Sequence, residues 1–242
     1  MARFYTANTI INRAAVECGI NPSSDPVAST DETFVQFKGL LDGAGQDLVE
    51  LYDWQGLRKP FKITTQAGDT GAYPLPDDFS AMVNQTGWDE TNRLPVGGPL
   101  SAQSWSYLDG SGFLDAPVYV TFQLEANKFQ LYPQPPPIGL EIAFQYQSRD
   151  WVTDAAGTTS SDTVNTGSDL VMYEPILIIK LLKAMFRSAK GFDATDAKNE
   201  FETIFLARTS RDKGAQVLSA GGYRGYPYLD RKNIPWTNYG DV

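Results

Sequence analysis

The sequence contains no histidine and only one cysteine, Cys18, among its 242 residues. Without histidine, Ser-His-Asp and Cys-His nucleophilic sites, histidine-ligated metals and imidazole pH switches are excluded. A single cysteine excludes an intramolecular disulfide and a thiolate zinc cluster. Chemistry that uses carboxylates alone, such as glycoside hydrolysis or the binding of hard cations, is still permitted.

Long apolar runs are also missing. The run Ile176 to Ile179, for example, is followed at once by Lys180, whereas a membrane-spanning helix needs roughly 20 apolar residues. The N-terminal stretch has no uninterrupted apolar segment and no small-residue cleavage site, which argues against a signal peptide. We therefore expect no membrane span and a protein that stays in, or is assembled in, the cytosol.

The residues that are present suit a globular protein with an uneven charge. Apolar residues make up 42% and aromatic residues 12% of the chain, enough to bury a core. Residues 1–57 hold three basic and eight acidic side chains, a net charge of −5, whereas residues 207–242 hold six basic and three acidic ones, a net charge of +3. An acidic body repels phosphate, so specific binding of nucleic acid is not expected.

Helical periodicity occurs at both ends of the chain. It predicts a short helix over residues 6–18 and a long amphipathic helix that begins at a capping box of Ser29 and Glu32 and runs to about Asp53. A third helix is predicted to start near Tyr173, and apolar residues nearly encircle it, which indicates a central position.

The third predicted helix has residues typical of a helix start and a helix end. Pro175 is tolerated in its first turn, and Gly191 is placed to end it. A fourth helix should follow with Asp193 as its N-cap. Because few residues separate the two helices, they should lie antiparallel.

The middle of the chain changes to a period of two from Arg58 onward. Short β-branched and aromatic runs bounded by Gly, Pro, Asp and Asn predict an antiparallel β module. Within it, "GGPLSAQSWSYLDGSG" is expected to hold one short helical turn. The segment "LYPQPPPIG", Leu131 to Gly139, is expected to be a rigid hairpin loop, because proline cannot continue a central strand.

These patterns together predict an α+β fold: an α-helical bundle body with an inserted antiparallel β module and an extended C-terminal arm. The helical body is expected to comprise residues 1–57 and 169–219, and the β module residues 58–152. A polar, Gly/Ser/Thr-rich flexible loop is expected over 153–168, and the arm over 220–242.

The adjacent acids Asp77 and Asp78 in "YPLPDDF" raise the question of a catalytic pair. Neighbouring residues on a strand point to opposite faces, whereas the carboxylates of glycosidases face each other about 5 to 10 Å apart. Pro76 followed by two aspartates is typical of a turn in which an aspartate oxygen accepts a backbone N–H. We therefore expect a turn, with no catalytic residue, no metal site and no cofactor.

The C-terminal arm is rich in aromatic and basic residues but has no helical or strand period. Such residues are typical of a segment that docks on a partner. The candidate partner-binding residues are Tyr223, Arg224, Tyr226, Tyr228, Arg231, Trp236 and Tyr239.

Three segments, in this order, resemble a known family. "YPLPDDFSAMVNQTGWDETNRLPVGG", "KFQLYPQPPPIGLEIAFQYQSRDWV" and "DLVMYEPILIIKLLKAMF" are similar to segments of the head-to-tail adaptor proteins of short-tailed bacteriophages, which include the tail tubular A and tail accessory factor proteins. The resemblance extends from about Asp31 to Phe205.

The resemblance implies a structural protein of the virion neck and tail, assembled in the host cytoplasm, with no enzyme activity. Twelve copies would form a ring beneath the portal protein and extend the DNA channel toward the tail nozzle or tail fibre proteins. Genomic DNA would pass through without specific binding, and no membrane would be involved. By analogy, the arm would reach the portal and the β module would face the tail.

One alternative function comes from the aromatic residues of the β region. Trp88, Trp105, Tyr107 and Trp151, with acids nearby, could belong to a carbohydrate-binding or carbohydrate-cleaving module, because sugar rings stack on such side chains.

Overall fold

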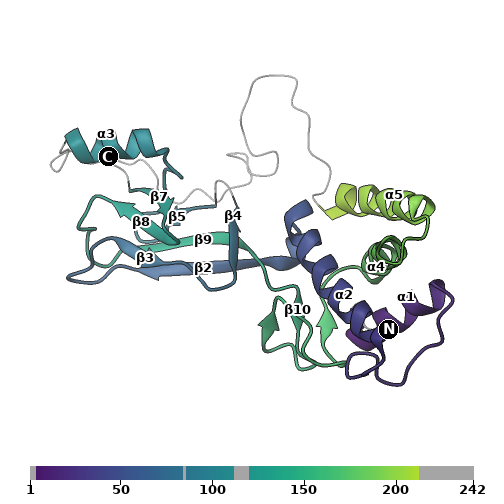
Figure 1. Cartoon of the computed structure of the whole chain (residues 1–242). Coiled ribbons are helices and arrows are strands. Elements are labelled where there is room, and N and C mark those ends of the chain that lie inside the picture. The colour runs from purple at the N-terminus through teal and green to yellow at the C-terminus, as the bar shows by residue number, and fades with distance from the viewer. Residues whose placement is uncertain (1–3, 84–85, 112–119, 213–242) are drawn as a thin grey trace, which may run out of the picture.

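The computed structural model describes residues 4–83, 86–111 and 120–212. Within these ranges it contains helices and antiparallel sheets, which confirms the mixed α+β class. The buried apolar residues form two separate clusters, one among the terminal helices and one among the central strands. Figure 1 shows the two parts at opposite ends of an elongated molecule, and we call them the helical body and the β module.

The helical body contains helices from both ends of the chain. They are α1 (Ala7–Glu17), α2 (Glu32–Leu51), α4 (Pro175–Ala189) and α5 (Thr195–Asp212). Helix α4 contacts α1, α2 and α5, in agreement with its encircling apolar residues. Pro175 occupies its first turn, and Gly191, at φ 76°, follows its end as predicted.

Helix α2 starts at a different cap from the predicted one. Its N-cap is Asp31, whose carboxylate accepts a hydrogen bond from the N–H of Thr33 at 2.8 Å. The Ser29 hydroxyl instead accepts from the N–H of Asp31, outside the helix. The predicted capping box is therefore wrong, because Glu32 is the first helical residue rather than the third. The apolar residues at helical spacing are mostly buried: Phe34, Phe37, Leu41, Ala44 and Leu48 are buried, Leu40 in the middle of the helix is partly exposed, and Leu51 at its C-terminal end is 55% exposed.

Both apolar contacts and ion pairs hold helix α5 against the rest of the helical body. Of its side chains only Ala197 is fully buried, while Phe201, Ile204 and Phe205 pack half-buried against the core. An ion-pair network also connects it to two other helices, with nitrogen–oxygen distances of 2.8 to 3.5 Å. The network joins Glu17 of α1, Lys180 and Lys183 of α4, and Glu200 of α5.

A small sheet that the sequence did not predict lies against these helices. Its strands, in spatial order, are β1 (Tyr5–Thr6), β12 (Leu170–Val171), β10 (Val152–Thr153) and β11 (Ser160–Ser161). Segment 153–168, predicted as a flexible loop, contains β11 and a turn in which Asp154 accepts hydrogen bonds from Thr158. Two-residue strands are too short to show a period, so the sequence carries no signal for them.

The β module consists of two sheets that share one core. One has the strand order β2-β9-β5-β6 with β4 also paired to β9, and the other has the order β3-β8-β7. Phe129 of the second sheet stacks on Phe144 of the first, with ring centroids 5.0 Å apart. The strands are β2 (Arg58–Thr64), β3 (Ala72–Pro74), β4 (Phe79–Met82), β5 (Trp88–Asp89), β6 (Leu94–Pro95), β7 (Thr121–Glu125), β8 (Lys128–Tyr132) and β9 (Glu141–Ser148).

Two details of the β module differ from prediction. The expected single turn is a ten-residue helix, α3 (Ala102–Ser111), and the Ser101 hydroxyl accepts a hydrogen bond from the N–H of Ser104 at its start. The segment Leu131 to Gly139 is not a hairpin loop, because β8 and β9 belong to different sheets. It carries the chain from one sheet to the other, a connection that local sequence cannot distinguish from a hairpin.

The β module returns to the helical body through Trp151, which is fully buried. Its ring lies so close to α2 that a Cβ built on Gly45 would be 2.0 Å from the ring atom Cε2. The indole N–H donates to the carbonyl oxygen of Asp162 at 2.7 Å, and the ring stacks on Tyr173. The Tyr173 hydroxyl in turn donates to the Gly45 carbonyl at 2.9 Å. Gly45, Trp151 and Tyr173 therefore join α2, the strand exit and the start of α4.

We expect Gly45→Ala to destabilise the protein by about 3 kcal/mol or more, because the new methyl group overlaps the indole in a close-packed core. Thermal or urea unfolding followed by circular dichroism measures the loss. The matched control is Gly39→Ala on the same helix, where a Cβ meets no atom within 4 Å. There, alanine should leave stability unchanged or raise it by up to about 1 kcal/mol. Equal effects of the two substitutions would contradict the packing argument.

Candidate functional site

The predicted partner-binding residues lie outside the described ranges. This applies to Tyr223, Arg224, Tyr226, Tyr228, Arg231, Trp236 and Tyr239. The nearest described part of the chain is the end of α5, at Asp212.

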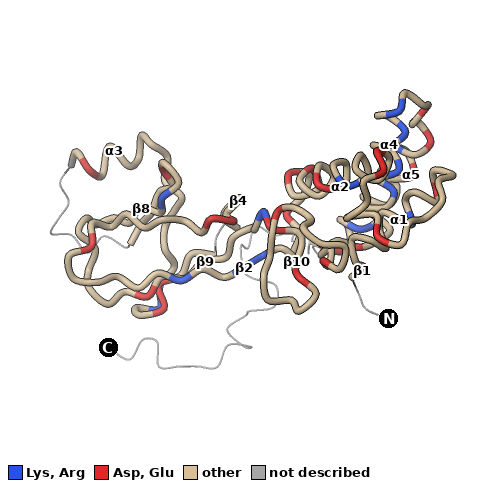
Figure 2. Tube along the Cα trace, turned by 60° about the horizontal axis from the view of Figure 1, so that its bottom comes forward, with Lys and Arg blue, Asp and Glu red and all other residues tan. Residues whose placement is uncertain are grey.

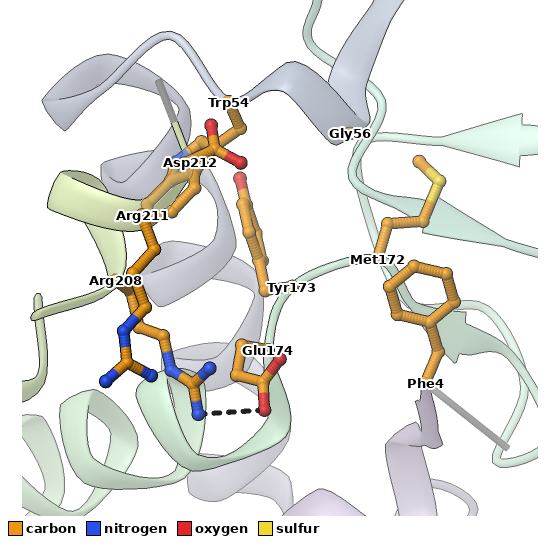
Figure 3. A pocket seen from close by; sticks show the side chains of 9 residues that line it. All are labelled: Phe4, Trp54, Gly56, Met172, Tyr173, Glu174, Arg208, Arg211 and Asp212. Carbon is orange, nitrogen blue, oxygen red and sulfur yellow. Dashed lines mark ion pairs between the residues drawn. The ribbon is translucent and has the colours of Figure 1, made fainter. Parts of the chain in front are cut away.

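The end of α5 borders a pocket of about 220 Å³ (Figure 3). It is lined by Phe4, Trp54, Gly56, Met172, Tyr173, Glu174, Arg208, Arg211 and Asp212. The lining residues come from both ends of the chain and from the α2–β2 connection, so no local motif in the sequence could have indicated this pocket.

Polar contacts fix the last turns of α5 at this pocket. Arg208 forms an ion pair with Glu174 at 3.1 Å, drawn as a dashed line in Figure 3. The carboxylate of Asp212 accepts a hydrogen bond from the N–H of Gln55 at 2.9 Å, and the Tyr52 hydroxyl donates to the carbonyl of Thr209 at 3.0 Å. The position where the chain leaves α5 is therefore tied to the connection between α2 and β2.

The wall of the pocket is aromatic. Trp54 and Tyr173 are both buried and meet edge to face at 5.8 Å, and the Trp54 indole donates to the Leu48 carbonyl at 2.7 Å. Burial raises the pKa of Tyr173, so its hydroxyl stays protonated. The pocket therefore combines two buried aromatic side chains with the arginines Arg208 and Arg211. The pocket lining contains no paired nucleophile and base of the kind that covalent catalysis needs.

The acids of "YPLPDDF" form a turn, as predicted, but not in the predicted way. The N–H of Phe79 donates to the carbonyl of Pro76 at 3.0 Å, which closes the turn. The side chain of Asp77 is exposed, and that of Asp78 is mostly buried. The Asp78 carboxylate does not cap a backbone N–H among the described residues. It instead accepts from Lys59 at 2.6 Å, Ser148 at 2.6 Å and Tyr146 at 2.9 Å.

These contacts determine the charge state of Asp78. Burial raises the pKa of its carboxyl, but the hydrogen bonds from Lys59, Ser148 and Tyr146 outweigh burial and hold the pKa below its ordinary value. The carboxylate is therefore ionised and fully engaged in structural contacts. Asp77 and Asp78 do not face a common space as two catalytic carboxylates would.

Other candidate residues are also part of the structure. Asp154 and Asp169, whose carboxylates are of the kind that bind hard cations, accept hydrogen bonds from Thr158 and Thr166 respectively. Within the described ranges, no three His, Cys, Asp or Glu side chains are grouped in a way that could hold a metal ion. Cys18 is half-buried, and burial raises the pKa of its thiol, which disfavours the reactive thiolate.

The aromatic residues of the carbohydrate alternative do not form one platform. Trp151 lies in the core of the helical body with no exposed surface, so it cannot stack on a sugar. Trp105 packs edge to face on Tyr132, with the ring centroids 6.0 Å apart. Trp88 and Tyr107 are exposed, but they lie on separate elements, β5 and α3.

Comparison with known proteins identifies the family. The sequence matches the family model described as SU10 adaptor protein over residues 5–223. The chain therefore belongs to the SU10 adaptor protein family and is a bacteriophage adaptor protein, which confirms the resemblance to head-to-tail adaptors. The family is structural and belongs to the neck and tail of the virion. No curated protein matches the sequence. None of the helices in the described ranges is long and apolar enough to cross a membrane.

We expect Asp78→Asn to lower the stability of the protein by about 1–3 kcal/mol at pH 7, because asparagine has no charge and presents an NH₂ group to side chains that donate to the carboxylate. Asp77→Asn is the matched control and should change stability by less than about 0.5 kcal/mol. Urea unfolding of the three proteins measures both effects.

The pH dependence of this difference follows from the lowered pKa of Asp78. A depressed folded-state pKa stabilises the protein above the unfolded value, near pH 3.9, and this stabilisation is lost as the pH falls through the folded-state pKa. The gap between wild type and Asp78→Asn should therefore narrow below about pH 4. A gap that stays constant down to acid unfolding would refute the assignment.

Proposed function

We propose that this protein is a head-to-tail adaptor that forms a ring, with twelve copies on the family pattern, joins the portal to the tail and extends the DNA channel. The observation that supports this function most is the family match, which covers residues 5–223 and so includes both the helical body and the β module. Its partners on this proposal are further copies of the chain, the portal and the tail nozzle or tail fibre proteins.

The shape of the chain supports an adaptor role. Its two hydrophobic cores lie at opposite ends of an elongated molecule (Figure 1), so each end can present its own surface to a different partner. A chain with one central core would have less separation between such surfaces. We assign the helical body to the portal side and the β module to the tail side.

The C-terminal arm is the proposed contact to the portal. It follows α5, whose last turn is held at the pocket by Asp212 and Thr209. The segment that leads to the arm therefore begins at this pocket, after Asp212. The aromatic side chains Tyr223, Tyr226, Tyr228, Trp236 and Tyr239 would supply large contact area, and Arg224 and Arg231 would supply charged hydrogen bonds.

The exposed edge of α2 is the proposed wall of the channel. Near its C-terminal end Asp47, Glu50 and Asp53 are exposed, and none of them forms an ion pair with another described residue. Figure 2 shows acidic positions along α2. Negative charge repels the phosphate backbone, so DNA would slide past this edge without being held.

Deletion of residues 220–242 tests the role of the arm. We expect the shortened chain to lose binding to its portal ring while its circular dichroism and unfolding midpoint stay those of the full chain, because the deletion leaves both hydrophobic cores intact. Negative-stain microscopy of the chain mixed with portal detects the complex. A chain that stays monomeric with portal present, and a deletion that changes nothing, would reject the proposal.

Charge reversal tests the channel wall. We expect Glu50→Lys to make the assembled ring retain double-stranded DNA, with an affinity that falls steeply as salt is added. Fluorescence anisotropy of a labelled duplex measures the binding. The control is Glu202→Lys on α5, which is also exposed and introduces the same charge change. Equal DNA retention by both variants would show that the α2 edge has no special position in the ring.

A further inference from the structure

The connection between the helical body and the β module is narrow. Within the described residues the chain passes between the two cores twice, from Leu57 in one core to Ile63 in the other, and from Tyr146 back to Trp151. These two crossings are adjacent, because β2 pairs with β9 from Arg58 opposite Gln147 onward. We call the start of this pairing, where Arg58 and Lys59 lie opposite Gln147 and Tyr146, the neck of the molecule. Figure 1 shows β2 and β9 connecting the two parts.

One lysine in the neck contacts both parts. The ammonium of Lys59 lies 2.6 Å from the carboxylate of Asp78, which precedes β4 of the β module. It also lies 3.3 Å from the carboxylate of Asp150 and 2.8 Å from the hydroxyl of Ser160, which is in β11 of the sheet on the helical body.

The partners of Lys59 are themselves held in place. The Ser160 hydroxyl donates to the Asp150 carboxylate at 2.8 Å, so the contacts on the body side form one unit. On the module side, Tyr146 and Ser148 donate to Asp78. The ammonium of Lys59 therefore lies between acceptor groups from both parts of the molecule: Asp78 on the module side, and Asp150 and Ser160 on the body side.

The energies of these ion pairs are small compared with the free energy of folding. A partly exposed ion pair contributes about 0–1 kcal/mol, and the side chain of Lys59 is 34% exposed, so these contacts are small beside a folding free energy of about 5–15 kcal/mol. The orientation of two parts with separate cores depends on far fewer contacts, because relative motion of such parts is the default. A contact of this size adds little to folding but can favour one orientation of the two parts over others.

We propose that Lys59 is an orientation latch. Its ammonium, held between Asp78 of the β module and the pair of Asp150 and Ser160 on the helical body, fixes the angle between the two parts. Without it, the β module swings about the paired strands of the neck. In the proposed adaptor this angle would set the direction in which the tail-side surface points. That use rests on the proposed function, whereas the latch is a property of the single chain.

The experiment measures the distance between the two parts in the full-length chain. Spin labels are placed on exposed positions by Gln103→Cys in α3 and Glu202→Cys in α5, with Cys18→Ala to remove the native thiol. Labelled chains are diluted with unlabelled protein, so that only distances within one chain are recorded by pulsed electron paramagnetic resonance. Circular dichroism and the unfolding midpoint establish that each variant is folded.

The matched control is Lys62→Met. Lys62 is also on β2 and also pairs with two carboxylates, those of Glu90 at 2.6 Å and Glu141 at 2.8 Å. Those contacts lie on the five-stranded sheet and its β5–β6 connection, within the β module. We expect Lys59→Met to broaden or displace the distance distribution, while Lys62→Met leaves it unchanged.

A second variant keeps the test decisive if Lys59→Met fails to fold. Asp150→Asn weakens only the body side and leaves the ion pair of Lys59 and Asp78 in place. It should broaden the distribution in the same direction. Unchanged distributions in the folded latch variants, or the same broadening in Lys62→Met, would overturn the latch. Because no portal or ring is needed, loss of the latch and failure of the proposed function give separate results.

Discussion

The contact of the Trp151 indole with the backbone of Gly45 is the constraint on which the arrangement of this protein depends. It lies where the last long strand of the β module re-enters the helical body, and it brings α2, the strand exit and the start of α4 within one packed unit. The close approach is possible only because residue 45 has no side chain. A helix interior ordinarily disfavours glycine, so its presence here reflects packing rather than helix formation.

Apolar burial and ion pairs contribute differently to the rest of the structure. Apolar burial in two separate clusters supplies the stability of each part. Partly exposed ion pairs lie at the joints: Lys59 at the neck, and the network of Glu17, Lys180, Lys183 and Glu200 where α5 packs on the other helices. Such pairs add little to stability but require specific geometry, which suits them to fixing how parts are oriented.

This division fits the proposed function, in which the adaptor would hold two partners apart. The helical body, with an acidic α2 edge, and the β module present distinct surfaces at opposite ends of the molecule. The pocket at the end of α5 adds a third feature, because the hydrogen bond from Gln55 to Asp212 holds the last residue of this helix there. None of these features needs catalytic chemistry.

The sequence alone predicted the fold class, four helices near their observed positions and an antiparallel β module that begins at Arg58. It also excluded histidine-based sites. These results follow from periodicity and composition, which are local properties. The four-stranded sheet, the path of Leu131 to Gly139 between sheets, the pocket and the three partners of Asp78 were decided only by tertiary structure. They depend on contacts between residues as distant as Lys59 and Ser160 or Tyr52 and Thr209, and no local pattern encodes which distant side chains meet.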